Sequence, residues 1–373
     1  MKVEFYKHNL GAEEKESVLE CLNGIFLTTG DYVKKFEEEF AAYMGLQHAV
    51  GLTSCTAALH LSLLALDIGQ GDEVITTPMT FIATSTAIIH TGAKPVFVDV
   101  EPESGLINPD LIESAITKKT KAILPVHLYG QMCDMRRLRE IADKYGLKII
   151  EDSAHCIEGE RDGIRPGSLS DIACFSFYAT KNITSGEGGA VATDNPQLAE
   201  RVRMLRQHGM SKEAADRYSG HYKHWDMIEC GWKYNMDNIQ ASLLLPQLKK
   251  IDQNWQGREK LYDRYREKIS ELSGIDLPKI HKNTKSAYHL FTIWVDPGKR
   301  DLVIYELGNM GIGVAVNYRA IHMLHYFVNR YGYSEKAYPI SEKIGDSTIS
   351  LPFYTKITDD EINFVLSALK SIL

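Results

Sequence analysis

Lys181 stands where a chemically active amine is expected. It closes the apolar run ACFSFYATK and is followed by NITSGEGG. Burial disfavours the charged form of an amine, so a lysine that leaves a buried strand has a lowered pKa and can attack carbonyl carbons. A lysine at a strand end is also commonly a surface residue. Because the glycines that follow let the backbone approach a ligand closely, we take Lys181 as a candidate nucleophile.

A carboxylate closes a second predicted strand. Asp152 ends the strand of KIIEDSAH, where it could hold the protonated ring nitrogen of an aromatic cofactor and keep that ring able to accept electrons. It could equally cap a following helix. His155, three residues later, is either a core histidine or a neighbour of the cofactor ring or its phenolic oxygen.

Two further segments suit a flat, phosphorylated ligand. The segment GLTSCTAALHLSLLAL, from Gly51, places small hydroxyl residues before an apolar helix, and the free amides at a helix N-terminus favour phosphate. Such caps are also common without a ligand. Phe81 lies at a predicted strand-to-helix turn in TTPMTFIATS, where its ring could stack on a cofactor or pack in the core.

Other ligand classes lack their motifs. No Gly-x-Gly-x-x-Gly follows a strand and no Walker A sequence occurs, which argues against nicotinamide and P-loop chemistry. The pairs His221/His224 and His322/His325 have metal-like spacing, but neither comes with a convincing third ligand. We therefore predict no metal site.

The elements that must position these residues alternate along the chain. Short β-branched runs begin at Glu73, Lys94, Lys121, Leu147, Ala173 and Gly189. Helical patterns lie between them, notably NPDLIESAIT from Asn108 and MRRLREIADKYG from Met135, the latter with Gly146 as its stop. This rhythm predicts an α/β fold with a large, doubly wound, mostly parallel sheet, which binds ligands at its strand ends.

A long helical stretch from Asn238 to about Leu272 contains Pro246, which should kink it. We place the domain boundary on it, giving a large domain over 1–250, with an N-terminal arm, and a small C-terminal α/β domain over 251–373. In the small domain, AYHLFTIWV and GVAVNY are expected as strands, and RDLVIYELGNMG and DDEINFVLSALKSIL as helices.

The composition of the chain indicates which classes of partner are not expected. The 373 residues are 44% hydrophobic with a formal net charge of -7, so nucleic acid is not an expected partner. The polar N-terminus and the lack of a long apolar run predict neither a signal peptide nor a membrane span. The six dispersed cysteines favour free thiols in the cytoplasm.

Taken in order, the segments GLTSCTAALHLSLLALDIGQGDEVITTPMTF, VHLYG, EDSAH, SFYATKNITSGEGGAVATDN, LRQHG and GWKYNMDNIQASL resemble the sugar aminotransferases of the DegT/DnrJ/EryC1/StrS family over essentially the whole chain. The resemblance implies fold-type I enzymes that use pyridoxal 5′-phosphate (PLP), usually homodimers with shared active sites. Lys181 matches the Schiff-base lysine and Asp152 the aspartate at the pyridine nitrogen. The remaining implied cofactor contacts are phosphate-binding amides at Thr56 and Ala57, a stacking ring at Phe81, a hydroxyl at Ser176, and Asn235 reaching the neighbouring subunit's phosphate site.

The resemblance also implies a substrate. Lys-Asn-Ile-Thr followed by Glu-Gly-Gly is similar to enzymes that aminate carbon 4 of UDP-linked keto sugars, with glutamate as the amino donor, for bacterial surface glycans. The segment VNYRAIHMLHYF resembles the one that closes over the sugar, which makes Tyr318, Arg319 and His322 substrate-site candidates. The alternatives are carbon 3, a GDP- or dTDP-sugar, a PLP lyase of amino acids, and a non-catalytic sugar-binding or regulatory homologue. Lys181 argues for transamination, because the family's dehydratases carry histidine there.

Overall fold

A seven-stranded sheet forms the centre of the protein. The computed structural model describes residues 1–211 and 224–373. The strand order is β1-β8-β7-β5-β4-β2-β3, and β8 runs antiparallel to both of its neighbours while the other pairs are parallel. The strands are β1 (His48–Leu52), β2 (Glu73–Thr76), β3 (Lys94–Phe97), β4 (Thr120–Ile123), β5 (Lys148–Asp152), β7 (Ile172–Ser176) and β8 (Gly189–Thr193).

The strands form where the sequence is apolar on both sides. In β7, every residue is buried, and successive side chains enter different cores: Cys174 packs with Leu61 on one face and Phe175 with Phe40 on the other. This double burial is typical of parallel sheets covered by helices on both faces. The expected large, doubly wound, mostly parallel sheet is confirmed.

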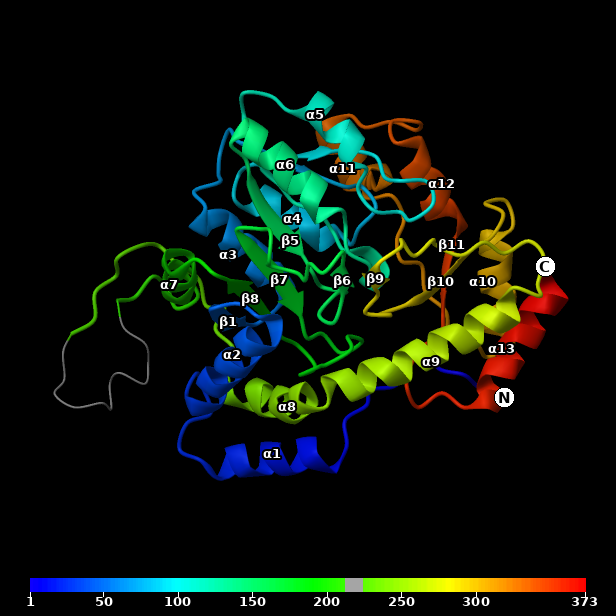
Figure 1. The fold of residues 1–373 in the computed structure, drawn as a ribbon, viewed down its shortest axis with the longest axis horizontal. Coiled ribbons are helices and arrows are strands. Elements are labelled where there is room, and N and C mark those ends of the chain that lie inside the picture. Colours follow the sequence, from blue (N-terminus) through cyan, green and yellow to red (C-terminus); the bar gives the residue numbers. More distant parts are fainter. Residues whose placement is uncertain (212–223) are drawn as a thin grey trace.

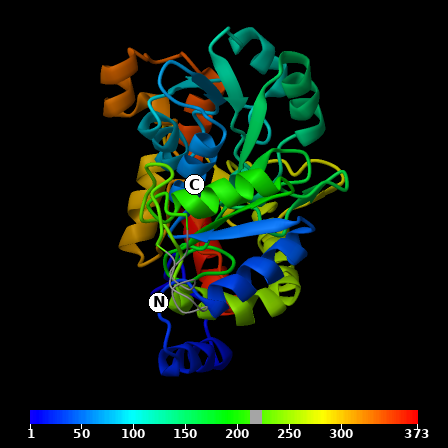
Figure 2. The ribbon, with the colours of Figure 1, turned by 90° about the vertical axis from the view of Figure 1, so that its left-hand side faces the viewer.

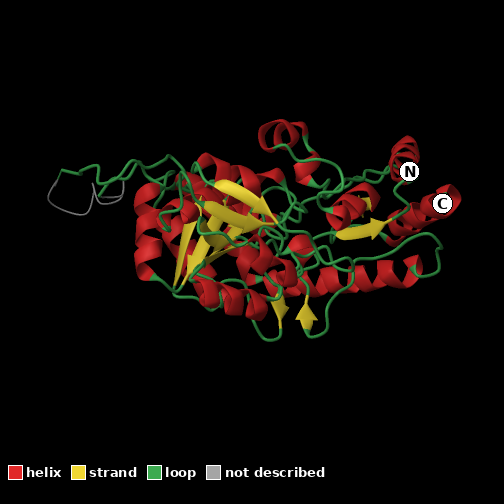
Figure 3. Ribbon diagram, turned by 90° about the horizontal axis from the view of Figure 1, so that it is seen from above, coloured by secondary structure: helices red, strands yellow, loops and turns green. Residues whose placement is uncertain are grey.

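Helices cover both faces of the sheet (Figures 1 and 3). Apolar residues of α3 (Cys55–Ala65), α4 (Ile82–His90) and α7 (Pro196–Leu205) share one core with the strands. On the other face lie α2 (Asp31–Met44), α6 (Met135–Tyr145) and α8 (Asn238–Lys249). Gly146, in left-handed conformation, ends α6 as predicted, whereas the helix expected from Asn108 shrinks to η1 (Pro109–Leu111) and α5 (Ile112–Ala115).

The long helical stretch is interrupted at Lys250, between α8 and α9 (Ile251–Ile269), and not at Pro246, which lies inside α8. A proline cannot donate to the carbonyl four residues earlier. That carbonyl, of Ser242, instead accepts a hydrogen bond from Ser17 Oγ at 2.8 Å. Ser17 belongs to α1 (Ala12–Asn23), which runs beside α8 at one edge of the molecule (Figures 1 and 2).

The C-terminal residues build a second core around a two-stranded antiparallel sheet of β10 (Phe291–Trp294) and β11 (Thr348–Leu351). The helices α9, α10 (Arg300–Asn309) and α13 (Asp359–Ile372) pack on it. The prediction of a strand over GVAVNY is wrong, because this segment makes only an isolated bridge, Ala315 to Ser350, among the described residues. Its backbone instead turns toward the large sheet.

Residues 317–347 lie between the large sheet and the C-terminal sheet, with Ile344 packed in the core of the large sheet and Ser347 O accepting from the amide of Val295 at 3.0 Å. The chain there forms η4 (Ile321–Met323), α11 (His325–Tyr331) and α12 (Pro339–Ser347). Asp99, which follows β3, accepts hydrogen bonds from the backbone amides of Ile340 and Ser341 at 3.0 and 2.9 Å and from Ser341 Oγ at 2.6 Å. The large sheet thus caps a helix from the other half of the chain. The remaining short elements are η2 (Leu128–Gly130), β6 (Glu160–Arg161) and β9 (Thr284–Lys285).

The N-terminal arm also joins distant parts of the chain. Val3 pairs in parallel with Ile312, and its amide donates to Gly311 O at 2.9 Å. Lys7 forms an ion pair with Glu361 of α13 at 3.0 Å. The two termini consequently lie at the same end of the molecule (Figure 3).

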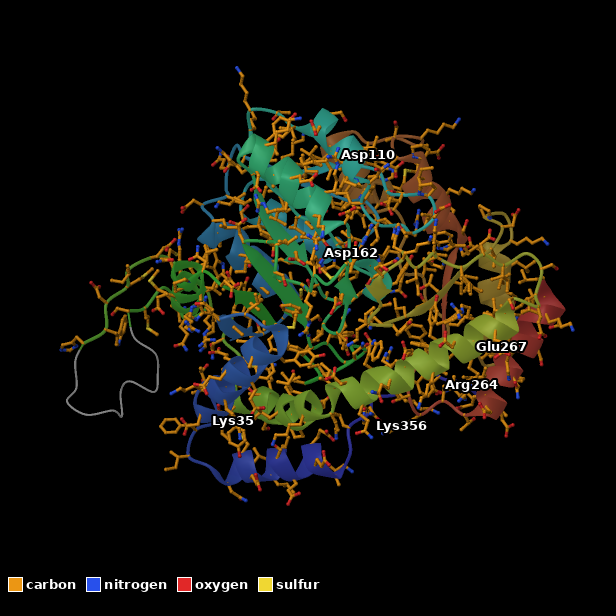
Figure 4. All side chains as sticks on the ribbon, in the orientation of Figure 1. Lys35, Asp110, Asp162, Arg264, Glu267 and Lys356 are labelled. Carbon is orange, nitrogen blue, oxygen red and sulfur yellow. The ribbon has the colours of Figure 1, made fainter. Side chains whose placement is uncertain are left out.

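Charged side chains lie on the outside of this frame. Figure 4 labels Lys35, Asp110, Asp162, Arg264, Glu267 and Lys356, and all six are exposed. Within the described residues, no helix combines the length and the apolar character needed to cross a lipid bilayer.

Candidate active site

A cavity of about 520 Å³ opens where β5 and β7 end, at the carboxyl edge of the parallel strands. Open α/β sheets bind ligands at this edge. Seven of the residues predicted from the sequence line it: Thr56, Phe81, Asp152, His155, Ser176, Lys181 and Tyr318.

Lys181 reaches the cavity from a turn that follows β7, with its backbone amide donating to Tyr178 O at 2.9 Å. Burial lowers the pKa of its amine to about 8, although Cys55 and Asp152 oppose that shift. The Nζ atom lies 3.5 Å from Nε2 of His289. A desolvated amine of this kind carries an available lone pair near neutral pH and suits attack on a carbonyl.

Asp152 ends β5 and points into the same cavity. Its Oδ2 accepts a hydrogen bond from Thr84 Oγ1 at 2.7 Å, and its Oδ1 accepts from the amide of Ala154 at 3.2 Å. Burial raises the pKa of this carboxyl, while the bond from Thr84 lowers it. No helix begins directly after Asp152 in the described chain, so a helix-capping role has no helix to serve.

His155 is held by two neighbours. Its Nδ1 accepts from the amide of Tyr129 at 3.2 Å, so the ring proton is on Nε2, which donates to the hydroxyl of Tyr318 at 3.1 Å. Burial lowers the pKa of the imidazole well below its usual value, which keeps it neutral. His155 therefore presents a neutral N–H group to Tyr318 at the wall of the cavity.

The start of α3 forms one corner of the cavity. Ser54 is its N-cap, and Ser54 Oγ accepts from the amide of Ala57 at 3.1 Å. Thr56 lines the cavity here, together with Ser176. The start of β8 closes the corner: a Cβ on Gly189 would lie 2.3 Å from the carbonyl carbon of Ser54, so only glycine lets the two backbones approach.

Aromatic rings form the mouth of the cavity. Phe81 is 54% exposed, and its ring centroid lies 5.7 Å from that of Tyr318. Phe5 of the N-terminal arm and Tyr178 complete this rim. Rings exposed at a cavity mouth can stack on flat ligands.

Four predicted site residues lie elsewhere. Ala57 does not line the cavity in the described structure, and its amide is already bonded to Ser54. Arg319 is exposed to solvent. His322 is fully buried and bonded to Glu342 at 3.1 Å, outside the cavity, because the segment after Tyr318 turns inward to pack on β3.

Asn235 is the fourth. Its side-chain amide donates to Thr29 Oγ1 at 2.8 Å, and it is not among the described residues that line the cavity. It does not cap α8, because Asp237 is the N-cap and accepts from the amide of Gln240 at 2.8 Å.

The sequence reasoning missed Thr84, His289 and Phe5. Thr84 lies three residues after Phe81 in the predicted helix. Its spacing of four from Thr80 places two hydroxyl groups on one helix face beside the candidate site, and this spacing could have indicated it. Phe5 and His289 approach through tertiary contacts that no local pattern indicates.

A metal finds no candidate site in the described part of the chain, where no group of three or more His, Cys, Asp or Glu side chains is suitably placed. His221, of the pair His221/His224, lies outside the described residues. The cavity instead fits PLP: a desolvated amine, a buried carboxylate, a helix N-terminus and an exposed ring surround one space.

Comparison with known proteins agrees with this geometry. A profile described as the DegT/DnrJ/EryC1/StrS aminotransferase family matches residues 8–370. An uncharacterised protein of Methanocaldococcus jannaschii is 44% identical over 98% of this chain and 96% of its own length. The spore coat polysaccharide biosynthesis protein SpsC of Bacillus subtilis is 40% identical over 98% of this chain and 95% of its own.

Solved structures are similar over nearly the full length. DesV of S. venezuelae, in complex with a ketimine intermediate, superposes with a TM-score of 0.89 at 36% identity, covering 96% of this chain and 94% of DesV. Spr1654 of Streptococcus pneumoniae in its PLP form gives 0.93 at 31% identity, with coverage of 100% and 98%. DesI, solved in the presence of its TDP-sugar product, gives 0.86 at 31% identity, with coverage of 96% and 89%.

Proposed function

The chain belongs to the DegT/DnrJ/EryC1/StrS aminotransferase family, and from this premise we propose that it transfers an amino group from glutamate to carbon 4 of a UDP-linked 4-keto-6-deoxy sugar. Membership makes the protein a PLP-dependent sugar aminotransferase. The product would serve a bacterial surface glycan, as the name of SpsC suggests for that relative.

In this proposal each cavity residue has a chemical role that follows from its surroundings. Bound PLP supplies an aldehyde that takes up the amino group and a ring that accepts electrons from the substrate carbon. Lys181 would hold the cofactor through its aldehyde carbon, and its Nζ, once free, would move a proton at the reacting carbons. Asp152 would keep the ring nitrogen protonated, while Phe81 would stack on the ring and Ser176 would bind the phosphate.

The single observation that carries the proposal is the pairing of Lys181 with Asp152 across one cavity. Burial pushes the pKa of the lysine down to about 8 and that of the carboxyl up. A lysine poised between its two protonation states can give and take a proton, which transamination requires and simple ligand binding does not.

The choice of substrate rests on a short sequence motif. The segment Lys-Asn-Ile-Thr with Glu-Gly-Gly favours carbon 4 and UDP, whereas DesI, one similar structure, was solved with a TDP-sugar product. The nucleotide is therefore the variable to test first.

The test uses protein carrying the pyridoxamine form of the cofactor. UDP-, GDP- and dTDP-4-keto-6-deoxy sugars are titrated separately, a 3-keto isomer is included, and return of the PLP absorbance and the mass of the amino sugar are recorded. We expect transfer to the UDP-4-keto sugar, and in the complementary half-reaction we expect glutamate to convert the PLP form back to the pyridoxamine form. The Lys181→Ala variant is the matched control. Amination only of the 3-keto sugar, or only of another nucleotide's sugar, would refute the corresponding part of the proposal.

We further propose a homodimer in which Asn235 of each chain completes the partner's phosphate site. Asn235 lies outside the cavity of its own chain, bonded to Thr29. Just before Thr29, Ile25 is 92% exposed and Leu27 45% exposed, and exposed apolar groups of this size suit an interface.

Complementation tests the shared site. Inactive Lys181→Ala chains are mixed with inactive Asn235→Asp chains, whose added carboxylate should repel the phosphate. If sites are shared, each heterodimer holds one intact site and one with both lesions, so activity returns on mixing. Chains that demonstrably exchange without recovering activity would exclude the shared site.

A further inference from the structure

A line of three polar side chains, Glu158, Asn182 and His289, leads to the amine of Lys181. His289, at the start of the segment leading into β10, is 3% exposed, and Glu158 is 2% exposed. Asn182 lies between them, directly after Lys181 in the sequence. The roles proposed above for Lys181 and Asp152 use none of these three side chains.

The orientation of the Asn182 amide follows from its partners. Its Nδ2 lies 3.1 and 3.0 Å from the two carboxylate oxygens of Glu158 and 2.8 Å from Ala287 O. All three are acceptors, so the NH₂ group must face them. The amide oxygen therefore faces His289, with Oδ1 3.4 Å from Nδ1.

This orientation fixes the tautomer of His289. Because Asn182 Oδ1 can only accept, Nδ1 of His289 carries the proton and donates. Its Nε2 is then an unprotonated acceptor, and it lies 3.5 Å from Lys181 Nζ. Burial, with Lys181 next in effect, lowers the pKa of His289 well below its usual value, so the ring stays neutral.

His155 has the opposite tautomer. The two rings are 4.4 Å apart, yet His155 carries its proton on Nε2 and directs it at Tyr318, whereas His289 directs a lone pair at Lys181. Two adjacent neutral imidazoles thus present a donor and an acceptor to different partners, and each choice is dictated by a neighbouring group.

We propose that His289 is a positioning residue for Lys181: its Nε2 accepts a hydrogen bond from the lysine amine whenever that amine is released from the cofactor, and Glu158 with Asn182 holds the imidazole in the tautomer that can do so. The inference rests on the proposed function. A released lysine has free rotation about four side-chain bonds, and a fixed acceptor keeps its nitrogen beside the reacting carbons.

The direction in which the pKa of Lys181 moves when His289 is replaced distinguishes a neutral acceptor from a cationic histidine. An acceptor stabilises the charged ammonium, so its removal should lower the pKa of Lys181, whereas removal of a cationic histidine would raise it. The other titratable groups that influence Lys181 are Asp152 and Cys55, whose charged forms raise its pKa. The neutral ring of His155 packs against His289 at a tilt of 44°, and Arg258 of α9 lies beyond His289, donating to its carbonyl at 2.7 Å.

The experiment measures the amine itself in cofactor-free full-length protein. Acetic anhydride is applied over a range of pH, and the acetylation rate of the Lys181 peptide is followed by mass spectrometry. The midpoint of the rise in acetylation rate with pH gives the pKa of Lys181. In His289→Phe this midpoint should move down by about one pH unit, so that labelling below it is about tenfold faster. In His289→Gln, whose amide oxygen can accept, the midpoint should stay near that of the unmodified protein.

His60→Phe is the matched control, because His60 is a buried histidine that is not among the described residues lining the cavity. Asn182→Leu should give a smaller downward shift, since the imidazole could then carry its proton on either nitrogen. If His289→Phe does not fold, His289→Leu replaces it.

If folded His289→Phe or His289→Leu has an unchanged or raised midpoint, the proposal is overturned. It is also overturned if His60→Phe shifts the midpoint by as much as the His289 variant does. Labelling needs neither substrate nor cofactor, so this outcome is distinct from a failure to aminate any keto sugar. When the same His289 variants are loaded with PLP, their kcat should fall while their KM changes little, because the lysine is misplaced but the substrate contacts remain.

Discussion

Replacing Thr84 by valine should raise the pKa of Asp152 without changing the shape of the site. The two residues are almost completely buried, and the hydroxyl donates to Oδ2 at 2.7 Å. A hydrogen bond to a charged group contributes about 1.5–3 kcal/mol, and one pKa unit corresponds to about 1.4 kcal/mol. The bond stabilises the charged carboxylate, so its loss should raise the pKa by about one to two units.

The assay is the pH dependence of kcat for amino transfer, followed by absorbance from about pH 4 to about pH 8. Turnover requires ionised Asp152 at the ring nitrogen, so kcat falls as pH drops through its pKa. In Thr84→Val this acid limb of the kcat profile should lie about one to two units higher, while kcat well above it is preserved.

Thr80→Val is the control. The Thr84 hydroxyl has a single proton, which it gives to Asp152, so at 2.7 Å it accepts from Thr80. Removing Thr80 leaves the bond to Asp152 in place, and the limb should move little. An acid limb in Thr84→Val that coincides with that of the unmodified protein would refute the reasoning.

Three further changes test the site and the fold. Lys181→Ala should abolish turnover while circular dichroism and PLP binding through the phosphate persist; wild-type rates would exclude it as the nucleophile. Asp152→Asn should cost several orders of magnitude in kcat and much less in PLP affinity, because a neutral amide cannot hold the ring nitrogen protonated; a loss of less than about tenfold would remove it from the mechanism. Asp99→Ala should lower the free energy of unfolding in urea by about 2–4 kcal/mol, because three donors from α12 lose their acceptor; an unchanged midpoint would show that water replaces the carboxylate.

The sheet could be predicted because β2, β4, β5 and β7 are short apolar runs separated by helical patterns. The direction of β8 could not, since antiparallel and parallel strands with both faces buried have the same apolar pattern. β1 was overlooked as a strand, because HAVGL contains glycine and alanine and leads directly into the start of α3. The segment GVAVNY has strand-like residues but extends between two cores, where Tyr318 reaches the cavity.

The cavity residues that could be predicted are those near strand ends, where chemistry is concentrated in this fold. Lys181, Asp152 and Phe81 each follow an apolar run. His322 could not be judged in the same way, because its burial against Glu342 depends on the path of the whole segment 317–347. His289 could not be identified from the sequence, because its contacts with Asn182 and Lys181 join segments more than 100 residues apart.

The N-terminal arm makes the C-terminal unit discontinuous in sequence. Val3 pairs with Ile312, Lys7 with Glu361, and Lys356 Nζ donates to His8 O at 3.2 Å. A chimaera that joined the first 250 residues of one relative to residues 251–373 of another would therefore cut these contacts, even though its junction at Lys250 falls between two helices. Recombining specificities within this family calls for exchanging the first ten residues together with the C-terminal part.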